Sequence, residues 1–205
     1  MESKAKVIVI GTLGIGKSTV MNKMSAGQKF NTSDEPEGCT KGPDSFTFNS
    51  DGKEITVVDT AGLNDNNMNI SLWINNYTEY AKKSDESAIS LAIIAFKASI
   101  RPGVEQKSDV ITALKAIKGL AASNMAVIFT FCETLDLRAK NQAGKIKANA
   151  WFDALKDPLK KVDGGEAFCD IPYERIFFFS NENGKSGPAT TQNDLLEFIK
   201  QHADF

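Results

Sequence analysis

The sequence predicts an α/β fold in which helices cover both faces of a mostly parallel six-stranded sheet that has one antiparallel hairpin at its edge. Three observations support this. Short apolar runs alternate with segments of helical periodicity along most of the chain. Residues 91–96 (LAIIAF) form a continuous apolar run, which is typical of a strand buried on both faces. Two further strand-like segments are separated by Asp51-Gly52, a dipeptide favoured in hairpin turns.

Length and composition predict one soluble domain over residues 1–205. The chain has 205 residues and a formal net charge of −2, with acids and bases interspersed, which argues against a general electrostatic attraction to nucleic acid or membrane. Its three cysteines lack a metal-binding spacing, and no apolar signal segment is present at the start. We therefore expect a cytoplasmic protein that reaches an intracellular membrane only through a partner or through segments absent from this chain.

The first half of the chain divides into a strand, a helix, a hairpin and a second helix. A strand over residues 7–10 leads through a glycine-rich loop into the first helix. Residues 25–44 are rich in Gly, Pro, Ser, Asp and Asn and predict a long loop, and residues 46–58 predict the hairpin. Residues 60–70 predict a second loop. The next helix is expected to pack a stripe of side chains into the core: Leu72, Trp73, Tyr77, Tyr80 and Ala81.

The second half continues the alternation of strands and helices. After the buried strand at residues 91–96, apolar residues at helical spacing predict a helix over residues 104–120. Residues 125–131 (MAVIFTF) predict another buried strand, and residues 176–179 (IFFF) predict the last one. Another helix is expected around residues 146–155. The closing helix should turn four side chains inward: Leu195, Leu196, Phe198 and Ile199.

A phosphate-binding loop lies between the first strand and the first helix. Residues 11–19 (GTLGIGKST) fit G-x-x-x-x-G-K-[ST], in which glycines let backbone N–H groups turn toward a polyphosphate at a helix N-terminus. Lys17 would reach the β- and γ-phosphates, and the Ser18 hydroxyl would bind Mg²⁺. The whole loop is therefore expected to bind nucleotide: Gly11, Thr12, Leu13, Gly14, Ile15, Gly16, Lys17, Ser18 and Thr19.

Residues 59–62 (DTAG) close a predicted strand with the pattern D-x-x-G. After a phosphate loop, such a segment is typical of a nucleotide-dependent switch. Asp59 would hold Mg²⁺ through a bound water, and the N–H of Gly62 would bond the γ-phosphate. Thr40, in the preceding loop, is the candidate hydroxyl that reaches Mg²⁺ and the γ-phosphate when triphosphate is bound. The competing hydroxyls in that loop are Thr32 and Ser33.

The ends of the last two strands are expected to recognise the base. Thr130 begins the pattern T-x-x-E, where many GTPases have N-K-x-D or T-K-x-D. Glu133 would accept from guanine N1–H and from the exocyclic amine, which adenine cannot satisfy, and Asp136 is the alternative partner. Phe131 replaces the usual lysine and would stack on the base. Asn181, after the last strand, would lie near the purine O6. These residues predict GTP and GDP as ligands.

With these motifs assembled, the chain resembles the immunity-associated nucleotide-binding GTPases of the GIMAP or avirulence-induced type. It looks more distantly like the chloroplast Toc receptors and the septins. The resemblance implies a fold of the P-loop GTPase type and a GTP-binding switch that assembles on itself or on membranes. The matching stretches are GTLGIGKST, EGCTK around Thr40, DTAGL from Asp59, FTFCETL from Phe129, and IRPGVEQ at residues 100–106.

The last of these stretches resembles the most specific box of that family, R-[FY]-T-x-E. Arg101 and Glu105 agree with the box, whereas Pro102 and Gly103 depart from its aromatic residue and threonine. Elsewhere DTAG stands in place of the usual DTPG.

Leu63 follows the D-x-x-G pattern, where Ras-like GTPases place a glutamine that orients the attacking water. Leucine cannot orient water, so we expect slow unaided hydrolysis. Arg101 is the candidate for a charge that a second copy of the chain supplies, which implies a nucleotide-dependent homodimer or oligomer. The predicted catalytic residues are Lys17, Thr40, Gly62 and Arg101.

Two other functions compete with a GTP hydrolase. The chain could be an assembly scaffold driven by nucleotide binding, in which turnover is incidental. It could also be a small-molecule kinase that uses ATP, although the sequence shows neither an arginine-bearing lid nor an acceptor carboxylate near the phosphates.

Overall fold

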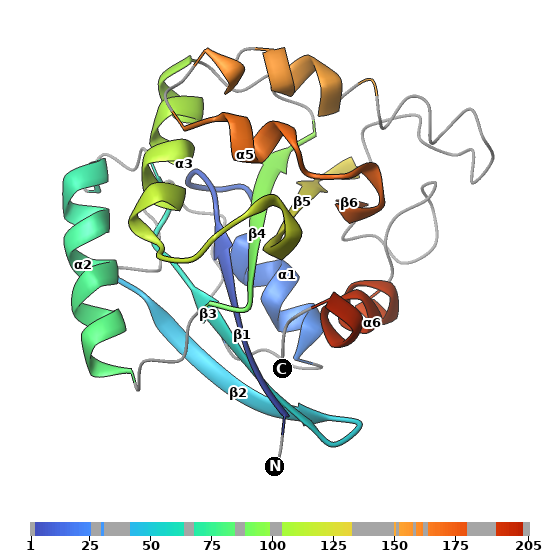
Figure 1. Cartoon of the computed structure of the whole chain (residues 1–205). Helices are drawn as coiled ribbons and strands as arrows, with labels where there is room; N and C mark the ends of the chain where they lie inside the picture. The colour runs from blue at the N-terminus through green and yellow to red at the C-terminus, as the bar shows by residue number, and fades with distance from the viewer. Residues whose placement is uncertain are drawn as a thin grey trace.

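The computed structural model of the chain describes residues 3–25, 30, 42–63, 68–84, 89–98, 104–132, 150, 152–157, 159–161, 164–179 and 192–202. They form the α/β fold expected from the sequence, with a six-stranded sheet in the order β2-β3-β1-β4-β5-β6 (Figure 1). All neighbouring strands are parallel except β2 and β3. The strands are β1 Ser3–Ile10, β2 Asp44–Ser50, β3 Lys53–Asp59, β4 Leu91–Lys97, β5 Met125–Thr130 and β6 Ile176–Phe178.

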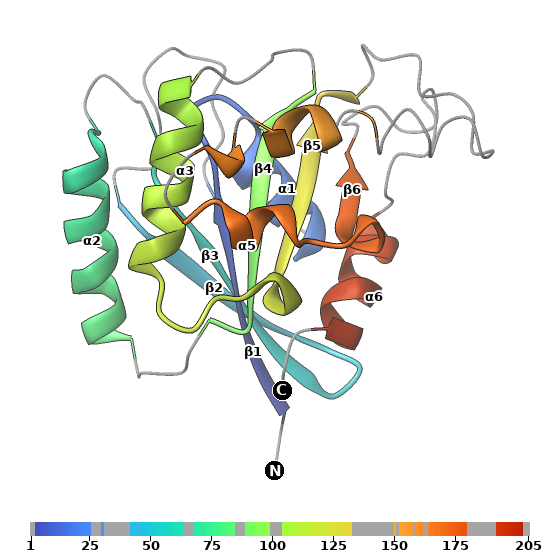
Figure 2. The ribbon, with the colours of Figure 1, turned by 45° about the horizontal axis from the view of Figure 1, so that its top comes forward.

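Helices cover both faces of this sheet, as Figure 2 shows: α3 and α5 lie in front of the strands, and α1 lies behind them. The longer helices are α1 Lys17–Met24, α2 Ile70–Lys83, α3 Val104–Ala116 and α6 Gln192–His202, and α5 Glu166–Cys169 is a single turn. Among the described helices, none is long and apolar enough to span a bilayer.

Each face of the sheet has its own apolar core, because successive side chains of a strand point to opposite faces. On β1, Ile8 and Ile10 belong to the core under α2 and α3, whereas Val7 and Val9 belong to the core under α1 and α6. Every residue of β4 except Lys97 is buried, which confirms the prediction of a central strand from its continuous apolar run.

The antiparallel hairpin forms the edge of the sheet, and its turn is the predicted Asp51-Gly52. Both residues have positive φ, 51° and 77°, as a tight two-residue hairpin turn requires. Lys53 Nζ donates to the carbonyl oxygen of Lys200 at 2.6 Å, and Lys200 in turn pairs with Asp51 and Glu197. The hydrogen bond from Lys200 holds the pKa of the Asp51 carboxyl below its usual value. These contacts join the hairpin to α6.

Three details differ from the sequence-based expectation. Leu72 is 40% exposed, although it was expected to pack in the core with its helical neighbours, because it lies one position before the buried Trp73 and so points off the apolar stripe. Helix α3 ends at Ala116, short of residue 120, and Gly119 follows with a φ of 80°. Helix α5 was missed, since one turn carries too little periodicity to detect.

Candidate functional site

The loop between β1 and α1 has the backbone of a phosphate cradle. Gly14 and Gly16 adopt positive φ values of 71° and 80°, and Gly16 caps α1 in the left-handed conformation without a side-chain hydrogen bond. Gly11 packs so closely on β4 that a Cβ atom there would lie 2.6 Å from the carbonyl oxygen of Ala95. The loop therefore requires its glycines, and it leaves the α1 N-terminus open to an anion.

Two side chains of α1 converge beside this loop. Lys17 is 7% exposed, and its Nζ donates to the carbonyl oxygen of Thr12 at 3.1 Å. The Ser18 hydroxyl donates to Asp59 Oδ2 at 2.6 Å, and Asp59 itself is buried at the end of β3. Residues 41 positions apart in the sequence thus form one cluster of a cation, a hydroxyl and a carboxylate. Thr19, also on α1, is half-buried.

The segment after β3 is joined to the phosphate loop by backbone hydrogen bonds. Leu13 N donates to the carbonyl oxygen of Leu63, and Leu63 N donates to that of Gly11, both at 3.1 Å. A Cβ atom on Gly62 would lie 2.5 Å from Leu13 Cα, so this contact also depends on glycine. Leu63 is 1% exposed and belongs to the core under α2 and α3. The side chain that replaces a water-orienting glutamine is therefore an anchor for the D-x-x-G segment.

Replacing Gly62 with alanine should separate this segment from the loop. The new methyl group overlaps the backbone of Leu13, which cannot move without breaking its bond to Leu63, so Gly62→Ala should lower the free energy of unfolding by about 2 kcal/mol or more. Gly42→Ala is the control, because nothing lies within 4 Å of a Cβ there, and it should change stability by less than about 0.5 kcal/mol. Urea unfolding of both variants measures the difference, and equal stabilities would contradict tight docking of Gly62 on the loop.

The end of β5 is tied to the other side of the phosphate loop. The Thr130 hydroxyl is buried and donates to the carbonyl oxygen of Ile15 at 2.6 Å. It also lies 3.3 Å from the carbonyl oxygen of Phe96 at the end of β4, and Ala98 N donates to Thr130 O at 2.9 Å. The predicted base-recognition segment thus begins at a rigid point that touches both β4 and the loop.

Phe131 turns out of the strand immediately after Thr130. Its φ is 56°, a left-handed value that non-glycine residues rarely adopt, and the strand expected to include it ends one residue earlier. A Cβ atom on Gly16 would lie 3.6 Å from the Phe131 ring, so the ring packs beside the start of α1. Lys97 Nζ lies 4.6 Å from the centroid of the ring. Lys97 and Phe131 therefore form a favourable cation–π contact next to the loop.

Sequence reasoning did not single out Lys97, which is simply the residue that ends an apolar run. Its cross-strand partner in the register of β4 and β5 is Thr130, and this non-local pairing brings it to Phe131. Thr40, Arg101, Glu133, Asp136 and Asn181, the other residues predicted for the site, lie outside the described residues, as do Thr32 and Ser33.

Helix α2 contacts the D-x-x-G segment directly. Trp73 Nε1 donates to the carbonyl oxygen of Ala61 at 3.2 Å, and the indole stacks on Tyr77 with 5.5 Å between ring centroids. Asn69 caps the helix by accepting from Leu72 N. A movement of residues 59–62 would therefore be transmitted to α2 through Trp73.

Comparisons with known proteins agree with this arrangement. Residues 6–131, more than half of the chain, match the family model described as 50S ribosome-binding GTPase. GTPase Der of Thermotoga neapolitana is 38% identical over 200 residues, which is 96% of this chain and 41% of Der. The chain thus spans less than half the length of this curated relative.

Among solved structures, a dimerization-deficient mutant of Toc33 from Arabidopsis thaliana has a TM-score of 0.73 at 15% identity, over 98% of this chain and 84% of Toc33. Toc33 in complex with GDP and Mg²⁺ has a TM-score of 0.70 at 15% identity, over 99% and 87% of the two chains. At 15% identity these structures establish only the fold of this chain. Its family is established by the family model that matches residues 6–131. The chain belongs to the family of 50S ribosome-binding GTPases.

Proposed function

We propose that this GTPase is a guanine-nucleotide switch that binds GTP and GDP with Mg²⁺, hydrolyses GTP slowly without help, and is stimulated by self-association. The observation that carries the proposal is the 2.6 Å contact between Ser18 and Asp59, which places a hydroxyl and a carboxylate at the mouth of a glycine-rich cradle. Lys17 supplies the positive charge beside them. A cation, inward-turned amides and paired oxygens together suit a polyphosphate with a bound metal.

The oxygen donors at this point suit Mg²⁺. Mg²⁺ prefers oxygen ligands and keeps several waters and phosphate oxygens, so it needs few protein ligands. The described residues contain no cluster of three or more acidic, histidine or cysteine side chains, in keeping with such a site. Ser18 would bind the metal directly, Asp59 would hold a metal-bound water, and Thr40 would complete the shell. When bound, Mg²⁺ would neutralise charge on the β- and γ-phosphates.

The base would lie toward β5. If Ser18 and Asp59 hold the metal, it would lie on the β3 side of β1, and the nucleoside would extend toward β4 and β5, on the other side of β1 in the sheet. Phe131 would stack on the base there, with Lys97 on the opposite face of its ring. Glu133 would accept from N1–H and the amine, with Asp136 as the alternative, and Asn181 would contact O6.

Self-association would supply the catalytic group that the site of an isolated chain lacks. Leu63 cannot orient water and is buried against the loop, so hydrolysis by the isolated chain should be slow. The Toc33 structure with a dimerization-deficient mutation belongs to a protein that dimerizes, and its fold matches nearly the whole of this chain. We propose a nucleotide-dependent homodimer in which Arg101 acts across the interface, a single G domain over residues 1–205, and a cytoplasmic protein of the GIMAP type. We also propose that nucleic acid is not among its partners.

The most direct test identifies the nucleotide that the protein carries. Protein purified without added nucleotide is denatured, and the released ligand is identified by chromatography. Guanine nucleotide supports the proposal, whereas adenine nucleotide would favour the kinase function.

Glu133 should set the preference for guanine. A desolvated carboxylate facing two donors should favour GDP over ADP by roughly 10⁴-fold, and Glu133→Ala should remove most of that ratio because adenine no longer leaves a buried carboxylate unpaired. Calorimetric titration with GDP and ADP measures it, and Glu133→Gln is the control that keeps size and loses charge. If Glu133→Ala keeps the full preference, Asp136 becomes the residue that recognises the base.

An assembly scaffold remains the second candidate, because the buried Leu63 favours binding over turnover. The two functions differ in whether turnover per chain rises with protein concentration.

A further inference from the structure

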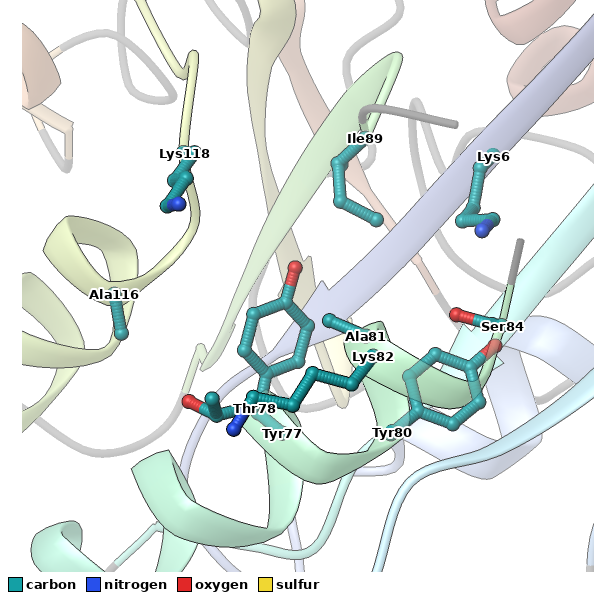
Figure 3. Close-up of a pocket in the computed structure, with 10 residues that line it drawn as sticks. All are labelled: Lys6, Tyr77, Thr78, Tyr80, Ala81, Lys82, Ser84, Ile89, Ala116 and Lys118. Carbon is teal, nitrogen blue, oxygen red and sulfur yellow. The ribbon is translucent and has the colours of Figure 1, made fainter. Parts of the chain in front are cut away.

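A cavity lies at the end of the sheet where β4 begins, whereas the phosphate loop lies at the end of the sheet where β1 ends. Its volume is about 450 Å³, within the range of small-molecule sites. It is lined by side chains of β1, of the last turns of α2, of the end of α3 with the segment after it, and of the segment before β4, all shown in Figure 3. None of them belongs to the nucleotide site described above.

The lining combines cations, hydroxyls and an apolar floor. Three lysines contribute to it, Lys6 from β1, Lys82 from α2 and Lys118 from the segment after α3, and none of the described residues that line it is acidic. In Figure 3 the ring of Tyr77 stands between Lys118 and Lys6 and carries its hydroxyl into the space between them. Ile89 provides apolar surface. A molecule that fills this space meets positive charge at its edges and carbon at its base.

Tyr77 adds a hydrogen-bond donor rather than negative charge. Burial moves the pKa of its hydroxyl further above physiological pH, so the phenol is neutral there. The Tyr80 hydroxyl is buried and has no hydrogen-bond partner among the described residues, and the same burial closes it to a ligand in the cavity.

We propose that this cavity binds a small anionic amphiphile, a molecule with an acidic head that pairs with Lys82 and Lys118 and with an apolar body that packs on Tyr77 and Ile89. The charge of the lining selects the head, and the volume limits the body to about two or three fused or linked rings, or a short acyl chain. The site has a built-in reporter, because Trp73 stacks on Tyr77.

The test uses two dyes with the same rings. Anilinonaphthalene sulfonate carries an acidic group, and phenylnaphthylamine lacks it; both become fluorescent in apolar surroundings. The full chain is titrated with each dye, first alone and then with excess GDP and Mg²⁺ so that the phosphate loop is occupied. We expect one sulfonate dye per chain under both conditions, bound at least about threefold more tightly than the neutral dye. In a Trp151→Phe background, the fluorescence of Trp73 should change with the same midpoint.

Variants assign the binding to the cavity. Lys82→Gln with Lys118→Gln should weaken sulfonate binding about three- to tenfold and leave the neutral dye unchanged, since each exposed ion pair adds little alone. Lys83→Gln with Lys160→Gln is the matched control, because both lysines are exposed and line no part of the cavity.

Two results would overturn the proposal. One is sulfonate affinity in the Lys82 and Lys118 double variant equal to that of its matched control. The other is equal affinity of the wild-type chain for the charged and neutral dyes. Circular dichroism of each variant ensures that dye binding does not come from unfolded chain.

Discussion

Lys17→Ala should weaken GDP binding by about 30-fold or more while leaving the fold intact. Lys17 is nearly buried beside the loop, and its charge would face the β- and γ-phosphates when nucleotide is bound. Removing one partner of a buried, hydrogen-bonded charge pair costs about 2–5 kcal/mol, which corresponds to roughly 30- to 5,000-fold in affinity. The backbone amides of the cradle remain, so residual weak binding is expected. Calorimetric titration with GDP and Mg²⁺ measures the loss.

The matched control is Lys23→Ala. Lys23 belongs to the same helix, α1, but lies in its last turn, away from the loop. Lys23→Ala should leave GDP affinity within about twofold, because a half-buried charge at the far end of the helix contributes little to phosphate binding. Native circular dichroism is required of both variants. GDP affinity of Lys17→Ala equal to that of Lys23→Ala would show that the loop does not bind the phosphates.

The sequence predicted the fold correctly where a structure depends on neighbouring residues or on a continuous run of one residue type. The Asp51-Gly52 turn needs two positive φ values that these residue types tolerate, and it has them. The run at residues 91–96 has no polar side, so it had to be covered on both faces. The glycines of the phosphate loop are likewise required by backbone geometry alone, as the near contact of Gly11 with Ala95 shows.

Details of the site that depend on pairing between distant segments could not be read from the sequence. Backbone hydrogen bonds join Leu63 to Gly11 and Leu13, which lie some 50 positions earlier in the sequence. The sequence therefore indicated that leucine cannot orient water, but it did not indicate how Leu63 docks on the loop. Lys97 reaches Phe131 because of the register of β4 with β5 and the left-handed turn after Thr130. Neither a register nor a left-handed phenylalanine has a local signal.

Arg101→Ala should abolish a concentration-dependent rise in GTP hydrolysis that the wild-type chain shows. Leu63 is fixed in the core and cannot orient water, so the site needs a group from elsewhere. Arg101 belongs to the connection between β4 and α3, and β4 ends on the same side of the sheet as the phosphate loop. Two chains that meet face to face through one self-complementary surface can each place Arg101 in the nucleotide site of the other. An arginine supplied in this way is worth roughly 10³- to 10⁵-fold in rate.

The measurement is phosphate release per chain from dilute to concentrated protein, with the oligomeric state determined by light scattering in the presence of GDP and a transition-state mimic. Arg101→Lys is the matched variant, because it keeps the charge but loses the planar fork that pairs with phosphate oxygens, so it should recover only a small part of the rate. GTP affinity should be unchanged in both variants. Constant activity per chain at every concentration, in protein that stays monomeric with the mimic, would show that Arg101 does not act across an interface.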